Sequence, residues 1–222
     1  MEVAMGLAIG VGALVLFEQD NPGAAQAMRD DLAYINTVLE AEGLPTHQEP
    51  EAFEGIEGER PRPRSSLNSF PYSWLHYLRR FGAHIMRDPR WVPYPVEPGE
   101  DPADDRVLRQ LYRQLRSHLL CHSDSEGYYL PIDFDEIYFD PKHKIRGGAL
   151  GSSIRLREEL LLLTDALEIE VDAEGNLDDD YAAELAAQRP AGQPFAIERL
   201  VWLSLYEAAR LSIAHKTAIT FY

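Results

Sequence analysis

The spacing of hydrophobic residues predicts a mostly helical chain. Met28, Leu32, Ile35 and Leu39 recur at intervals of three and four residues, which places them on one face of a helix. Asn21-Pro22 supplies an N-cap followed by proline at the first helical position. Gly43 and Pro45 then end the pattern, so a helix is expected between about residues 22 and 42.

Further helices and a few strands follow from the same reading. Helical spacing returns in the ranges 70–86, 101–119, 154–167 and 195–214, and the last of these is apolar almost all round. Short apolar or branched runs in 3–17, 127–134 and 217–222 predict strands. Without regular alternation of strands and helices, the expected fold class is α+β, with a small sheet of two or three short strands.

The length favours a single domain over residues 1–222. Residues 44–70 lack a sustained hydrophobic period and contain Arg60-Pro-Arg-Pro-Arg64, whose prolines exclude a helix. We therefore predict a Pro/Arg-rich surface connection there.

Charge is unevenly distributed along the chain, whose formal net charge is −16. Residues 1–59 sum to −11, residues 60–116 to +5 and residues 117–222 to −10. Because an acidic protein repels phosphate, we expect no binding to nucleic acid or to anionic membranes. A basic protein partner fits this charge better.

The N-terminal apolar run does not predict a leader or a membrane span. It has no basic residues before it, it is shorter than a bilayer requires, and it contains Gly6, Gly10 and Gly12. The single cysteine, Cys121, cannot form an internal disulfide. A cytoplasmic location is the expectation.

The segment 118–136 concentrates groups that could bind a cation. His122, Asp124, Glu126 and Asp133 occupy positions 1, 3, 5 and 12 of a window that is similar to a calcium loop. The histidine at position 1, the short Asp at position 12 and an internal Pro131 argue against an EF-hand. A transition-metal site is the alternative, with His118 and His122 four residues apart and Asp124 or the more distant His143 as a further ligand. Capping and packing roles are the structural interpretation.

A glycine-rich turn lies shortly downstream. Gly147, Gly148 and Gly151 precede a helix expected to open at Ser152 or Ser153, and free amides at such a start attract anions. The opposing interpretation is an ordinary turn with serine capping. The candidate ligand-binding residues are Asp124, Glu126, Tyr128, Asp133, Arg146, Gly148, Ser152 and Ser153.

The run from His122 to Phe134, followed by Gly147-Gly-x-Leu-Gly-Ser-Ser153, resembles a group of small bacterial proteins without an established activity. The segments Gly6–Ile9 and Phe70–Leu75 are similar to that group too. The resemblance implies no function, cofactor or site residue. It implies only that the two candidate constellations belong to one design.

These observations lead to a functional hypothesis. We expect a binding protein that acts through protein contact, by analogy with immunity proteins, or by capture of a small polar ligand. The lack of a complete catalytic constellation favours this over catalysis, and no cofactor is expected. The alternative is a hydrolase-like enzyme that uses a divalent metal at His122, Asp124, Glu126 and Asp133 on an anionic substrate. The oligomeric state does not follow from the sequence.

Overall fold

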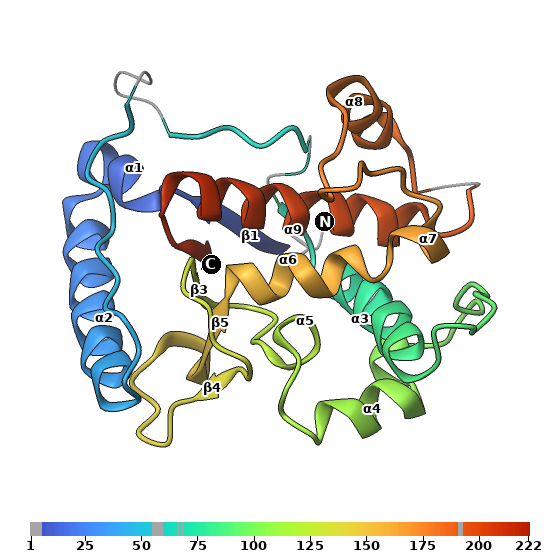
Figure 1. The fold of residues 1–222 in the computed structure, drawn as a ribbon, viewed down its shortest axis with the longest axis horizontal. Coiled ribbons are helices and arrows are strands. Elements are labelled where there is room, and N and C mark those ends of the chain that lie inside the picture. The colour runs from blue at the N-terminus through green and yellow to red at the C-terminus, as the bar shows by residue number, and fades with distance from the viewer. Residues whose placement is uncertain (1–5, 55–59, 66, 68, 191–192) are drawn as a thin grey trace.

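The computed structural model describes residues 6–54, 60–65, 67, 69–190 and 193–222. In Figure 1, helices lie on both sides of a central sheet, with α1 and α2 along one flank and α9 and α6 across the middle. The helices have the bounds α1 Ala13–Asp20, α2 Pro22–Ala41, α3 Tyr72–Arg87, α4 Arg106–Tyr112, α5 His118–Cys121, α6 Ser153–Leu161, α7 Thr164–Leu167, α8 Asp179–Ala187 and α9 Ala196–His215, with 3₁₀ turns η1 Pro102–Asp104 and η2 Arg146–Gly148.

Among the described residues, one mixed sheet of six strands corrects the expectation of a small sheet with two or three. Its order is β2-β1-β6-β3-β5-β4, with every pair antiparallel except β3 and β5. The strands have the bounds β1 Gly6–Val11, β2 Ser69–Pro71, β3 Gly127–Leu130, β4 Tyr138–Phe139, β5 Ala149–Ser152 and β6 Ile219–Phe221. The α+β class holds. The sequence missed β2 and β4 because they are only three and two residues long.

The strand β5 was missed for a different reason. Its residues lie in the glycine-rich turn predicted at 147–151, and Gly151 has no side chain that marks a strand. In the fold, the Tyr129 ring lies directly against Gly151, so closely that a Cβ at this position would collide with the ring. The glycine is therefore required for a close approach between neighbouring strands.

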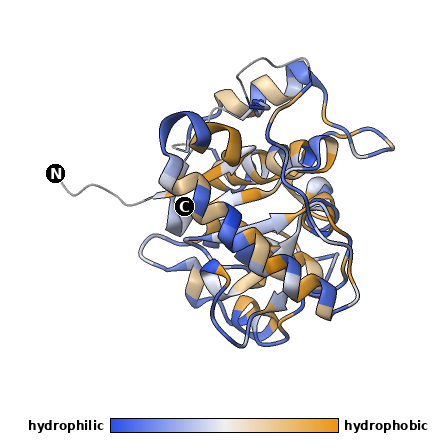
Figure 2. Cartoon of the chain, turned by 90° about the vertical axis from the view of Figure 1, so that its left-hand side faces the viewer, coloured by the Kyte–Doolittle hydropathy of each residue, from blue (hydrophilic) through white to orange (hydrophobic). Residues whose placement is uncertain are grey.

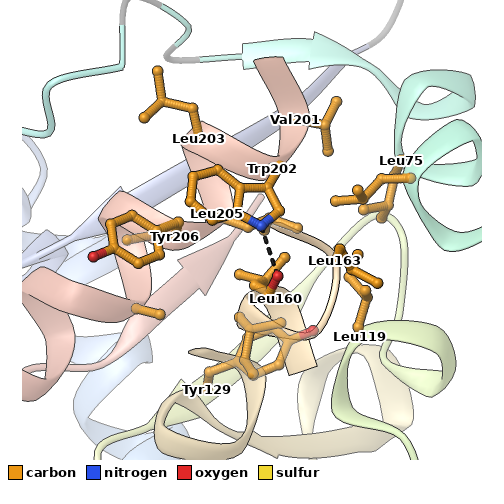
Figure 3. Close-up of a cluster of buried hydrophobic side chains, with 14 of the residues drawn as sticks. Leu75, Leu119, Tyr129, Leu160, Leu163, Val201, Trp202, Leu203, Leu205 and Tyr206 are labelled. Atoms are coloured by element: carbon orange, nitrogen blue, oxygen red, sulfur yellow. Dashed lines mark hydrogen bonds between the residues drawn. The ribbon is translucent and has the colours of Figure 1, made fainter. Parts of the chain in front are cut away.

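Side chains of β3 alternate between two cores. Tyr129 faces the larger core, which is built from α3, α6 and α9, whereas Tyr128 and Leu130 face a smaller core beneath α1 and α2. Figure 3 shows Trp202 of α9 in the larger core, donating a hydrogen bond from its indole N–H to the Leu160 carbonyl at 2.8 Å. In Figure 2, which looks onto the α2 side, hydrophobic residues gather toward the interior.

Three predicted elements are divided in the structure. The helix predicted over 154–167 forms α6 and α7. The apolar run at the N-terminus forms β1 and then α1, separated by Gly12 with a left-handed φ of 65°; residues 3–5 of that run lie outside the described range. The helix predicted over 101–119 breaks near Leu115, whose φ is 55°. Along the described chain, no helix is both long and apolar enough to cross a membrane. The 44–70 connection falls partly outside the described residues, and the single-domain prediction stays a prediction.

Candidate functional surface

His118, at the start of the corner predicted from the sequence, is part of the core. Its Nδ1 accepts a hydrogen bond from the Ser152 N–H at 2.9 Å, and its ring packs edge-on against Phe134. The side chain is fully buried, and this burial lowers the pKa of the imidazole to about 4. His118 is therefore a neutral hydrogen-bond acceptor at neutral pH.

His122 has a similar structural position. Its ring stacks on Tyr129 with centroids 4.0 Å apart, and its two nitrogens lie 3.1 Å and 3.0 Å from the carbonyl oxygens of Ser123 and Tyr128. Burial lowers the pKa of His122 to about 4, despite these carbonyl acceptors. Both nitrogens are engaged by the corner itself, and neither points to a neighbouring carboxylate.

The carboxylates proposed as metal ligands do not converge. Asp124 lies 3.3 Å from His76, Asp133 pairs with Arg155 at 2.7 Å, and Glu126 is exposed. Over the described ranges, no three His, Cys, Asp or Glu side chains gather in a metal-binding arrangement. The metal site stays a prediction for which the fold assembles no ligand cluster.

The glycine-rich turn lies against the corner. Gly147 lies against the Glu126 carbonyl, and Arg146 pairs with Asp31 at 2.8 Å beside the Tyr128 hydroxyl, which donates to the same carboxylate at 2.7 Å. Gly148, which was predicted to help bind an anion, has a role in the turn instead. Gly148 is half-buried, and its φ of 71° serves the turn.

The two serines at the start of α6 lie in the interior. The Ser152 hydroxyl donates to the Ile132 carbonyl at 2.6 Å and accepts from the Arg155 N–H, so it caps the helix. Ser153 accepts a hydrogen bond from the Ser212 hydroxyl at 2.9 Å. Both serines are completely buried. Their hydroxyls hold α6 to its neighbours.

A strongly charged surface lies elsewhere, in residues 165–184, which we call the acidic segment. It runs from α7 through an extended stretch and a turn into α8. Between residues 164 and 188 there is no Lys or Arg. The segment has nine carboxylates, and each belongs to an exposed residue: Asp165, Glu168, Glu170, Asp172, Glu174, Asp178, Asp179, Asp180 and Glu184.

Three arginines from outside hold the acidic segment through its backbone. Arg157 donates to the Gly175 carbonyl at 2.8 Å, Arg199 to the Leu167 carbonyl at 2.8 Å, and Arg64 to the Leu177 carbonyl at 2.7 Å. Within the described part of the chain, ion pairs reach only two of the nine carboxylates, those of Glu168 and Asp179. The arginines thus fix the segment and leave most of its negative charge facing solvent.

Local hydrogen bonds define the shape of the acidic segment. Asp172 accepts from the backbone N–H groups of Glu174 and Asn176 and from the Asn176 side chain, closing the turn before Gly175. The hydrogen bonds from Asn176 lower the pKa of Asp172, so its carboxylate stays ionised. Asp178 caps α8 by accepting from the N–H groups of Asp180 and Tyr181. The turn and the start of α8 are therefore ordered by side chains of the segment itself.

From the sequence we assigned a net charge of −10 to residues 117–222 as a whole, and we placed the candidate site in the corner at 118–136. The signal that identifies the acidic segment is simple, because it is the charge run without a single basic residue. The hydrogen bonds from arginines of other elements to backbone carbonyls of the segment could not be predicted from the sequence.

A family model described as "Putative DNA-mimic protein" matches residues 5–221, nearly the whole chain. No curated protein and no solved structure matches it.

Proposed function

This chain belongs to the Putative DNA-mimic protein family, and we propose that its acidic segment occupies the DNA-binding surface of a partner protein in place of DNA. The observation that carries this proposal is the row of nine exposed carboxylates, most of them without a basic neighbour. The proposal keeps the expected mode of action, protein contact, and names the partner class as DNA-binding proteins.

The family corrects the partner prediction made from composition. That prediction named a basic protein or a small polar ligand as partner and expected no binding to nucleic acid. A DNA mimic is related to nucleic acid through the proteins that bind it. The net charge of −16 repels DNA itself but attracts the cationic surfaces that bind DNA.

The spacing of the carboxylates supports mimicry of a phosphate backbone. Glu170 and Asp172 are exposed while Ile169 is buried and Val171 is half-buried, so alternate side chains face solvent. Two residues of extended chain cover about 6.6 Å. Successive phosphates of one DNA strand are separated by a rise of ~3.4 Å along the axis and by a sideways step as the helix rotates. Together these place them about 7 Å apart.

The helix α8 continues the row with a similar interval. Asp180 and Glu184 are four residues apart, so they lie on the same face with their Cβ atoms about 6 Å apart. Because the extended stretch and α8 are both fastened to the core, the carboxylates are held before the partner arrives. Such preorganisation reduces the entropy lost on binding.

The hydrolase-like alternative receives no support. Its proposed ligands Asp124 and Asp133 pair with His76 and Arg155, and the imidazole of His122 is enclosed by the corner. No observation on the described residues favours catalysis over binding.

A competition experiment tests the proposal. DNA-binding proteins from a native lysate are retained on DNA-cellulose, and the purified chain is added at increasing concentration. The test variant neutralises five carboxylates that have no capping or turn role, by Asp165→Asn, Glu170→Gln, Glu174→Gln, Asp180→Asn and Glu184→Gln. The matched control removes the same number of exposed charges elsewhere, by Asp20→Asn, Glu40→Gln, Glu42→Gln, Glu97→Gln and Glu100→Gln.

We expect the wild-type chain and the control to release a defined protein from the DNA. The test variant should need roughly 50- to 100-fold more protein, at about 0.5 kcal/mol for each exposed ion pair. Release of nothing by the wild-type chain, or equal release by test and control variants, contradicts the proposal.

A further inference from the structure

A pocket of about 440 Å³ adjoins the acidic segment where α7 approaches the start of α9 and the loop after α3. Glu168 belongs both to the segment and to the wall of this pocket. The pocket is therefore continuous with the surface proposed to replace DNA. Its walls include Pro93, Ala166, Glu168, Pro194, Phe195 and Arg199.

The pocket has an apolar part to its wall, beside the polar side chains of Glu168, Gln193 and Arg199. Pro93, Ala166, Pro194 and Phe195 contribute rings or a methyl group. The Phe195 ring packs edge-on against Phe81 with centroids 5.4 Å apart, and Phe81 packs in the same way against Trp91. This aromatic series prevents the wall from closing on itself. An apolar group that enters can bury its surface without rearrangement.

Charge at the pocket favours an apolar occupant over a basic one. The Arg199 guanidinium donates to the Leu167 and Pro194 carbonyls at 2.8 Å and 3.1 Å, so a fixed cation lies in the wall. The Glu168 carboxylate, with its side chain 84% exposed, lies at the surface beside it. A partner's basic side chains are therefore attracted to the segment outside, whereas its apolar side chain fits the pocket.

The backbone at the pocket is held in an unusual conformation. Glu168 and Phe195 have φ values of 56° and 58°, in the left-handed region that non-glycine residues seldom adopt. Strained residues of this kind persist where the surrounding structure enforces them, and they cluster at functional sites. Two such residues in one small wall indicate that its shape is maintained against a conformational cost.

We propose that this pocket receives the apolar wedge side chain that one class of DNA-binding protein inserts between base steps. Such proteins contact the backbone with basic residues and unstack a step with Phe, Leu, Ile, Met or Pro. The acidic segment offers the charge of the backbone, and the adjoining pocket offers the apolar space of the opened step. This inference rests on the proposed function and narrows its partner to minor-groove architectural proteins.

Two large apolar side chains that lie near pocket-lining residues in the sequence are exposed. Val92, which precedes Pro93, is 80% exposed, and Leu162, shortly before α7, is 61% exposed. They have the highest exposed fractions among the large hydrophobic side chains of the described residues. Side chains of this kind are available for contact with a partner.

Direct binding to a purified architectural protein of the HU type, which uses such a wedge, tests the inference. Ala166→Phe fills the pocket without changing the charge, and Ala41→Phe makes the same change at the exposed end of α2, outside both the pocket and the acidic segment. Ala166→Phe should weaken binding about tenfold, as expected when one apolar side chain loses its site. Ala41→Phe should stay within about twofold.

A change in the probe makes the result independent of the folding of Ala166→Phe. Replacing the wedge residue of the HU-type protein by Ser should weaken its binding to the wild-type chain about tenfold and should not further weaken binding to Ala166→Phe. Equal binding of both probes to the wild-type chain overturns the inference. The inference is also overturned if the wild-type chain displaces a helix-turn-helix repressor from DNA but does not bind the HU-type protein. That result would leave the proposed function in place. A wild-type chain that displaces neither protein overturns this inference, and the DNA-cellulose competition then decides the proposed function separately.

Discussion

Acidification should destabilise the protein through His118. This imidazole is fully buried, and its Nδ1 accepts the Ser152 N–H, a bond that protonation of Nδ1 would abolish. In the folded state its pKa is lowered to about 4, from 6.5 in the unfolded chain. Below pH 6.5 the unfolded state therefore binds a proton that the folded state does not, and stability falls as the pH drops toward 4.

The magnitude follows from these two values. Between pH 7 and pH 5, linkage gives a loss of about 2 kcal/mol from His118 alone. His118→Asn offers a side-chain oxygen near the position of Nδ1 and does not titrate, so it should lack this part of the loss. His122, buried with a pKa of about 4, contributes a similar pH dependence to both proteins and cancels in the comparison.

Urea unfolding at pH 7 and pH 5 measures the effect. The wild-type free energy of unfolding should fall by about 2 kcal/mol more than that of His118→Asn over this interval. Only the change in the free energy of unfolding between the two pH values is compared, because the substitution also alters packing at both. Parallel losses in the two proteins would refute the assignment of His118 as a neutral core acceptor.

Two further predictions concern the support of the acidic segment and the metal hypothesis. Burial alone would raise the pKa of the Glu207 carboxyl, but hydrogen bonds from Arg210 and Arg64 outweigh it and bring the pKa to about 2. Glu207→Gln leaves these arginines without their buried carboxylate, so it should lower the free energy of urea unfolding by about 3 kcal/mol. The exposed Glu184→Gln should lower it by almost nothing. Equal stability of the two variants would exclude Glu207 as a structural support. Zinc, manganese, calcium or EDTA should leave the melting temperature unchanged, because the candidate ligands around Asp124 do not converge, and a clear rise with one metal would revive that site.

Hydrophobic periodicity predicted the long helices well. The cap at Asn21 and the stripe from Met28 to Leu39 correspond to α2, and the nearly all-apolar run after Phe195 corresponds to α9. The sheet was underestimated because strand pairing is non-local. β2 has only three residues, and its pairing with β1 links positions more than sixty residues apart.

The candidate site shows the same limit at the level of side chains. Composition marked His122 and Asp124 as chemically interesting, but their partners, Tyr129 and His76, come from other elements. The acidic segment needed no folding information to find, since its charge run is visible in the sequence. What the sequence could not predict is that Arg157 bonds a carbonyl rather than a carboxylate, which leaves the charge exposed.

The salt dependence of binding tests the central claim most directly. The protein released from DNA-cellulose is titrated with the wild-type chain and with the five-carboxylate test variant at NaCl concentrations from about 50 to about 200 mM. If exposed carboxylates replace phosphates, the wild-type affinity falls steeply with salt, and the variant binds more weakly with a shallower dependence. A wild-type affinity that does not change with salt, or the same slope for both proteins, would contradict DNA mimicry by this segment.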